Sequence, residues 1–280
     1  MERPINDLEA KKLLCSNLDT LVKFFDEHGL RYFLSYGTLL GAVRHQGFIP
    51  WDDDVDVMMP RPDYNRFLDL TRQIKVNANL DVLYFPETAQ YFWPFAKIVN
   101  TDTMLIEKQL RNDLQHWLKQ YYGLYIDIFP IDGFPDNKDE QIRFFRRITS
   151  YMKGLQRSTY MARRVPSKPM TMLLRVIYKA SELLGFRYYL KKLTQLAQTY
   201  PYDKQDFVGS CFGSYGIREV VKKEYFVDSV DVSFEGRAYS APIGYHEYLA
   251  SIYGDYMKLP PEEKRVSHHR RELYWRDHVS

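Results

Sequence analysis

The apolar and polar positions of this chain change period along the sequence, from a helical repeat to the alternation of a strand. Apolar residues at helical spacing over 7–28 predict a first helix that stops at Gly29. The short apolar segment 30–35 predicts a buried strand, and a short helix over 39–43 follows it. Acidic and apolar residues then alternate over 54–59, so the acids of this predicted strand share one face.

The next part of the chain continues with one helix and several strands. Pro62 suits the first turn of a helix that runs to about residue 74. Three further apolar runs are each bounded by chain-turning or polar residues and predict strands at 80–85, 95–99 and 125–131.

The second half of the chain has a mainly helical pattern. Residues 137–200 predict helices with a break near 165–169, and a region of mixed pattern covers 207–241. A last predicted helix ends near Gly254, and the closing segment 259–275 is too polar to be part of the core. A helix, then acid-bearing strands, then a helical and basic second half predict an α/β (α+β) fold.

The composition is that of a soluble globular protein, with 45% hydrophobic and 27% charged residues. The first residues lack the apolar region of a secretory signal, and no stretch reaches the roughly 18 uncharged apolar residues of a spanning helix. Two cysteines, Cys15 and Cys211, lie far apart in the sequence, which argues against a disulfide framework or a Cys-rich zinc site. We therefore expect a cytoplasmic protein.

Positive charge is concentrated in residues 143–192, although the whole chain carries only +3. This stretch contains 13 Lys or Arg and one acid, Glu182, for a net charge of +12, which leaves −9 for the rest of the chain. Such asymmetry indicates an anionic partner. We expect an anionic membrane surface rather than nucleic acid, with the protein peripheral on the inner face of the membrane. Pairing of these charges with the acidic remainder of the chain is the alternative.

Three acids are candidates for a metal site. Asp54 and Asp56 lie two apart on a predicted strand, so both carboxylates share one face and can share a divalent ion. Asp127 lies on another predicted strand among apolar neighbours, where a carboxylate needs a partner. Carboxylates on adjacent strands suit two-metal phosphoryl chemistry. The alternative is that Asp52, Asp53 and Asp54 cap a turn while Asp127 pairs with a buried Arg.

Groups that bind a phosphorylated donor are expected around Gly37 and Thr38, between a predicted strand and a predicted helix. Backbone N–H groups and a hydroxyl can face phosphate oxygens there, and a plain tight turn is the alternative. Arg44 and Lys97 are candidates for the positive charge on the phosphates. Lys97 lies in an apolar segment, where an unpaired ammonium would be costly, so a salt bridge to one of the acids is also open.

One block of sequence resembles a known family. The segment YFLSYGTLLGAVRHQGFIPWDDDVDVMMPRPDY (32–64) is similar to the signature of the LicD-type phosphocholine transferases, which include the fukutin-like enzymes. The resemblance continues through WPFAKIV, YIDIFPID and the tail YGDYMKLPPEEKR, and is weakest between about 140 and 205. A block of some 30 residues is far more specific than an isolated DxD motif.

The resemblance implies a nucleotidyltransferase-type mixed sheet flanked by helices. In it Gly37 and Thr38 match the Gly-Ser/Thr element, Asp54 and Asp56 the paired metal ligands, and Asp127 the third carboxylate. It also implies Mg²⁺, or Mn²⁺ in its place, and a CDP-activated alcohol: CDP-choline in many bacterial members and CDP-ribitol in the fukutin-like ones. We expect residues 1–140 to form the catalytic core, with the helical basic region and C-terminal segment, 141–280, packed on it at the acceptor side.

The predicted function is transfer of a phospho-alcohol, phosphocholine first, from the CDP-activated donor to a hydroxyl of a glycan or of its lipid-linked precursor. Trp51 is expected to stack on the cytosine or to anchor its loop, and His268 to contact phosphate or acceptor or to lie at the surface. Two rival interpretations stay open. One is a nucleotidyltransferase that uses a nucleoside triphosphate and releases pyrophosphate, and the other is a non-catalytic membrane or nucleic-acid binding protein.

Overall fold

The structure is a computed structural model that describes residues 3–106, 112–159, 176, 179–266 and 272–276. Its helices within these ranges are α1 (Asp7–Glu27), α2 (Tyr36–His45), α3 (Arg61–Thr71), α4 (Asn112–Tyr121), α5 (Lys138–Thr159), α7 (Phe186–Ala197) and α8 (Tyr245–Tyr253). The strands are β1 (Phe33–Leu34), β2 (Asp56–Pro60), β3 (Leu80–Leu83), β4 (Ala96–Asn100), β5 (Thr103–Ile106), β6 (Tyr125–Phe134), β7 (Phe207–Gly209), β8 (Val221–Lys222), β9 (Ser229–Phe234), β10 (Arg237–Pro242) and β11 (Glu272–Trp275).

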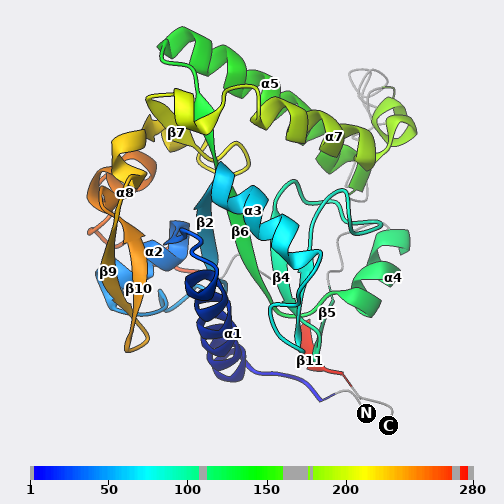
Figure 1. Ribbon diagram of the computed structural model, residues 1–280. Helices are drawn as coiled ribbons and strands as arrows, with labels where there is room; N and C mark the ends of the chain where they lie inside the picture. The colour runs from blue at the N-terminus through cyan, green and yellow to red at the C-terminus, as the bar shows by residue number, and fades with distance from the viewer. Residues whose placement is uncertain (1–2, 107–111, 160–175, 177–178, 267–271, 277–280) are drawn as a thin grey trace.

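The centre of the molecule is a mixed sheet with the strand order β1-β2-β6-β4-β3 (Figure 1). Strands β2 and β6 are parallel, whereas the other neighbours in this order are antiparallel. The long strand β6 continues past this sheet and pairs with β7, which in turn pairs with β8. A mixed sheet with helices packed on it confirms the α+β fold class predicted from the sequence.

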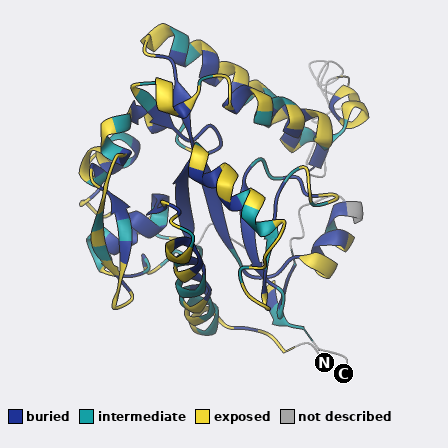
Figure 2. Ribbon diagram, viewed as in Figure 1, coloured by how far each residue is buried: buried dark blue, intermediate teal, exposed yellow. Residues whose placement is uncertain are grey.

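The core lies around the central strands. Every residue of β2 and of β4 is buried, and Figure 2 shows the central strands buried along their length. Helix α3 crosses in front of β2 and β6 in Figure 1 and contacts both strands. Helix α1 buries an apolar face at helical spacing that includes Leu14, Leu18 and Leu21. Because both faces of the central strands are buried, their sequences are apolar runs rather than alternating patterns. The acids within them are exceptions.

The remaining elements surround this core. The hairpin of β9 and β10 contacts α2 and β1 at the left of Figure 1. Helices α5 and α7 pack against each other at the top of the view, where a Cβ on Gly154 would collide with the ring of Tyr189. None of the helices within the described ranges combines the length and the apolarity that a bilayer crossing demands.

Most of the elements predicted from periodicity are confirmed, but three features differ. The strand predicted at 30–35 has only two residues, because residues 30–32 pair with no strand and α2 already begins at Tyr36. Strand β5 and helix α4 were not predicted. The closing segment is not wholly outside the core, since β11 pairs with β5 and buries Leu273. Strands β7 to β10 occupy the region that was predicted to be mixed, while the domain boundary near residue 140 stays a prediction.

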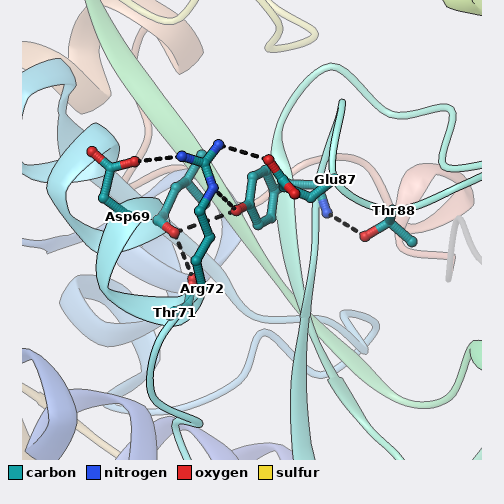
Figure 3. Close-up of polar contacts among 7 residues, drawn as sticks. Asp69, Thr71, Arg72, Glu87 and Thr88 are labelled. Carbon is teal, nitrogen blue, oxygen red and sulfur yellow. Dashed lines mark hydrogen bonds and ion pairs between the residues drawn. The ribbon is translucent and has the colours of Figure 1, made fainter.

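Two arginines at the ends of α3, Arg61 as its first residue and Arg72 directly after its last, form ion pairs in contrasting surroundings. Arg61 donates two hydrogen bonds to Asp132 of β6, at 2.6 and 2.9 Å, and the Asp132 side chain is only 1% exposed. Arg72 pairs with Asp69 and Glu87, both at the surface, and also donates to the hydroxyl of Tyr84 (Figure 3). The first pair is desolvated and bidentate, whereas water screens the second.

Replacement of Arg61 by Met should therefore lower the free energy of unfolding by about 3–5 kcal/mol, because it leaves the Asp132 carboxylate buried without its partner. The matched substitution Arg72→Met should cost about 1 kcal/mol or less. Urea denaturation followed by circular dichroism measures both. Equal losses in the two variants would contradict the structural role given to the buried pair.

Candidate active site

Three neighbouring strands place charged side chains in one row across the sheet. Asp56 of β2 is the register partner of Asp127 of β6, and Asp127 is in turn the register partner of Lys97 of β4. Partners in register on adjacent strands point to the same face of a sheet. The Lys97 ammonium forms an ion pair with the Asp127 carboxylate. The row therefore runs carboxylate, carboxylate, ammonium, with all three residues buried.

This row opens into a cavity of about 580 Å³. Asp54 was predicted to lie in the strand, but β2 begins only at Asp56, and Asp54 lies just before it. Asp54 still lines the cavity together with Asp56 and Asp127. The structure thus brings the three predicted carboxylates to one place. The full lining is Tyr36, Gly37, Leu40, Arg44, Ile49, Trp51, Asp52, Asp54, Asp56, Phe95, Asp127, Phe129, Phe212, Gly213, Ser214, Tyr215, Tyr253, Pro260 and Lys264.

The first turn of α2 packs directly against the acidic segment. A Cβ at Gly37 would collide with Oδ2 of Asp52, so the glycine lets this carboxylate approach the helix in its present position. Thr38 is buried and does not line the cavity; its hydroxyl accepts a hydrogen bond from the N–H of Asp56 at 2.9 Å. Thr38 therefore positions the start of β2, and a contact of its hydroxyl with phosphate stays a prediction.

The electrostatics of the cavity favour a cation. Burial raises the pKa of Asp56 well above its ordinary value, and the negative charges of Asp54 and Asp127 raise it further. Carboxylate oxygens are the ligands that Mg²⁺ prefers. Among the described residues, the acids whose oxygens lie within 4.8 Å of one another are Asp52, Asp53 and Asp54, so Asp54 belongs both to this group and to the predicted trio. The chemistry of these carboxylates suits a divalent ion, and its binding by Asp54, Asp56 and Asp127 stays a prediction.

Lys97 does not line the cavity. Two roles were predicted for this lysine, a contact with phosphate or a salt bridge to an acid. The structure shows the salt bridge, which Lys97 forms with Asp127. Burial lowers the pKa of Lys97, and the adjacent Asp127 carboxylate opposes that shift. The ammonium also lies over the ring of Tyr125, 3.6 Å from its centroid. Lys97 thus offsets the charge of Asp127 without lining the cavity. The charges of Asp54 and Asp56 are then the ones that a bound cation would neutralise.

The described cationic residues that line the cavity come from α2 and from the C-terminal segment. Arg44 lines the cavity and donates a hydrogen bond to the carbonyl of Tyr256 at 2.7 Å. Lys264 lines it from beyond α8, and the Arg265 guanidinium lies 5.9 Å from the ring centroid of Trp51. Arg44 and Trp51 are therefore at the cavity as predicted, in a setting that suits the phosphates and base of a nucleotide.

Some lining residues were not predicted as site residues. The segment 212–215 comes from the second half of the chain, and no motif marks it, whereas Tyr253 is the first residue of the tail that carries the family resemblance. Lys264 lies in the tail that carries the family resemblance, which is the signal that could have found it. Asp53 lines a second cavity of about 450 Å³, which shares Trp51 and Asp52 with the first. His268 lies outside the described residues.

Comparison with known proteins gives one family. Residues 29–167 match the family described as LicD/FKTN/FKRP, nucleotidyltransferase domain. Over 278 residues the chain is 35% identical to the lipopolysaccharide cholinephosphotransferase LicD of Haemophilus influenzae. The aligned region covers 95% of this chain and 97% of that protein. A shorter stretch of 49 residues, 18% of this chain and 16% of the relative, is 45% identical to an uncharacterised protein of Rickettsia typhi.

The acids make a direct prediction about metal binding. Asp54→Asn and Asp56→Asn should each weaken Mg²⁺ binding at least about tenfold, because each removes one negative charge from the ligand set. Isothermal titration calorimetry measures the affinity. Without metal, Asp56→Asn should melt no lower than the wild type, since the substitution relieves repulsion between carboxylates. The exposed Asp231 supplies the control Asp231→Asn. Wild-type Mg²⁺ affinity in both cavity variants would remove the metal site from this position.

Proposed function

The chain belongs to the LicD family, and on this basis we propose that it is a transferase that moves phosphocholine from CDP-choline to a hydroxyl of a glycan. The acceptor is a cell-surface glycan or its lipid-linked precursor, and CMP is released. The observation that carries the proposal is the similarity over 95% of the chain to a lipopolysaccharide cholinephosphotransferase. The three carboxylates that line one cavity support it, because phosphoryl transfer needs such a site.

The chain's own residues have distinct parts in this reaction. Asp54, Asp56 and Asp127 would hold Mg²⁺ or Mn²⁺, which supplies charge neutralisation at the diphosphate and a lower pKa for the acceptor hydroxyl. The acceptor oxygen forms a bond to the distal phosphorus as the bond from that phosphorus to the CMP oxygen breaks. The hydroxyl proton passes to the Asp127 carboxylate. Lys97 forms an ion pair with that carboxylate and so offsets its negative charge before the step.

The other cavity residues orient the donor. Arg44 and Lys264 offer cationic donors to the diphosphate, Arg44 as a fork and Lys264 as a point charge. Trp51 offers a ring on which the cytosine can stack. Because Gly37 brings backbone to the cavity wall without a side chain, the first N–H groups of α2 are the third group of donors for phosphate oxygens.

Release of CMP tests this function against a nucleotidyltransferase, which uses the same acids. The purified protein with Mg²⁺ should release CMP from CDP-choline in the presence of lipopolysaccharide or a lipid-linked glycan, faster than from CDP-ribitol, CDP-ethanolamine or CDP-glycerol. EDTA should abolish release, whereas simple charge-driven binding survives chelation. Chromatography of the nucleotides gives the rates. Pyrophosphate from a nucleoside triphosphate, with no turnover of any CDP-alcohol, would reverse the assignment.

The basic second half supports a membrane location for the reaction. On α5 the apolar residues Phe144, Phe145 and Leu155 are buried in the core, so their rings and methyl groups cannot contact a membrane. The exposed face of α5 carries Arg146 and Arg147, among others. In the helical turn before α7, Leu183 is 91% and Leu184 51% exposed. Exposed cations and exposed leucines in the same basic region of the chain suit an anionic bilayer surface.

We therefore expect the protein to bind anionic vesicles at low salt. In sedimentation with vesicles of phosphatidylglycerol and phosphatidylcholine, the bound fraction should grow with anionic lipid and fall as salt rises. Arg146→Glu with Arg147→Glu should weaken binding by roughly tenfold or more, since each cation near the surface contributes about 1 kcal/mol.

A variant with the same change of charge elsewhere is the control. Lys12→Glu with Lys75→Glu alters exposed lysines of the N-terminal half and should leave binding to anionic vesicles nearly unchanged. Equally weak binding of the wild type to anionic and to neutral vesicles would contradict the membrane location. The transferase assignment does not depend on this result.

A further inference from the structure

One wall of the active-site cavity is built from aromatic rings that touch one another in sequence. Phe95 contacts Phe129 with 4.2 Å between ring centroids, and Phe129 meets Tyr36 edge to face at 5.1 Å. Tyr36 stacks on Tyr215 at 5.8 Å, and Tyr215 meets Tyr253 edge to face at 4.9 Å. All five line the cavity, and Phe212 lines it next to them. We call the six residues Tyr36, Phe95, Phe129, Phe212, Tyr215 and Tyr253 the aromatic wall.

The aromatic wall adjoins the acids. Phe129 follows Asp127 by two residues on β6, so both side chains point to the same face, roughly 7 Å apart along the strand. Phe95 directly precedes β4, whose first residue pairs with β6 between those two positions. The described cations of the lining, Arg44 and Lys264, come from α2 and from the C-terminal segment instead. A positively charged group at the wall therefore meets aromatic rings and carboxylates.

A buried carboxyl group holds part of the wall in place. The Tyr36 hydroxyl donates to Oε2 of Glu219 at 2.5 Å, and the N–H of Tyr215 donates to Oε1 at 3.0 Å. The Tyr215 hydroxyl donates to that of Tyr253 at 2.8 Å. Burial raises the pKa of Glu219 to about 7. A Cβ at Gly213 would collide with the Tyr36 hydroxyl and with the Glu219 carboxyl group. The glycine therefore lets the loop backbone lie against both of these groups.

We propose that the aromatic wall binds the trimethylammonium group of choline and so selects the alcohol that is transferred. This inference rests on the proposed function and names its specificity determinant. A quaternary ammonium donates no hydrogen bonds, and ring faces with diffuse negative charge are its preferred surroundings. Choline separates its ammonium from the phosphate by only two carbons, so the ammonium pocket must adjoin the acids that face the phosphate, as the wall does. Rings held before binding lose little entropy when the ligand arrives.

The test separates charge from shape. CDP-3,3-dimethylbutanol carries a tert-butyl group of the same shape as trimethylammonium but without charge. The wild type should prefer CDP-choline over this isostere by about fivefold to thirtyfold in kcat/KM, the range of a desolvated cation–π contact. In Phe129→Leu and in Tyr215→Leu the preference should fall toward one. Calorimetric binding of the two donors should show the same change, which gives a second measurement independent of turnover.

Phe234→Leu is the matched control, because Phe234 is buried against Phe48 and Tyr239 and does not line the cavity. It should keep the wild-type preference. Phe212→Leu, a change in a loop, keeps the test informative where Phe129→Leu fails to fold. An unchanged preference in every wall variant would overturn the proposal. So would an equal loss for both donors with weaker CMP binding, which would assign the wall to cytosine. A wild type inactive on all CDP-alcohols would instead overturn the proposed function itself.

Discussion

The parallel pairing of β2 with β6 is the constraint on which the site depends, because its register sets Asp56 beside Asp127. Two carboxylates side by side in a buried sheet repel each other, and burial adds to the cost of their charge. Lys97 on the next strand offsets one of them. The other carboxylates face the cavity, and this concentration of acids is what favours the proposed metal ion at that place.

The chain before β2 is tied to the same row of acids. The N–H of Ser35 donates to the carbonyl of Asp56 at 3.1 Å, and the N–H of Asp56 donates to the Thr38 hydroxyl. Gly37 lets the Asp52 carboxylate approach the start of α2. The turn into α2 and the acidic segment are thus one unit with mutual contacts. This explains physically why the signature of the family is one continuous block rather than scattered residues.

Sequence patterns predicted the parts of the fold that local periodicity determines. Helix α1, strand β6 and the acids at and just before the start of β2 carry strong signals, since apolar spacing and a buried Asp are both visible in the chain. Strand β5 has only four residues, and the role of Leu273 depends on its pairing with Leu105 of β5, which lies 168 residues earlier in the chain. The contribution of segment 212–215 to the cavity likewise depends on long-range contacts with Tyr36, which no local pattern records.

A second charged pair joins β6 to the first residue of α3, which directly follows β2, and the contrast explains how the site is supported. Asp56 and Asp127 form the like-charged pair at one end of β2, whereas five residues later along each chain Arg61 and Asp132 form a bidentate ion pair. Both pairs are buried, so both feel little screening by water. Opposite charges at the far end oppose separation of the strands, which the repulsion between the acids would favour. The ion pair between Arg61 and Asp132 therefore stabilises the pairing of β2 with β6. This stabilisation offsets the repulsion between Asp56 and Asp127 at the cavity.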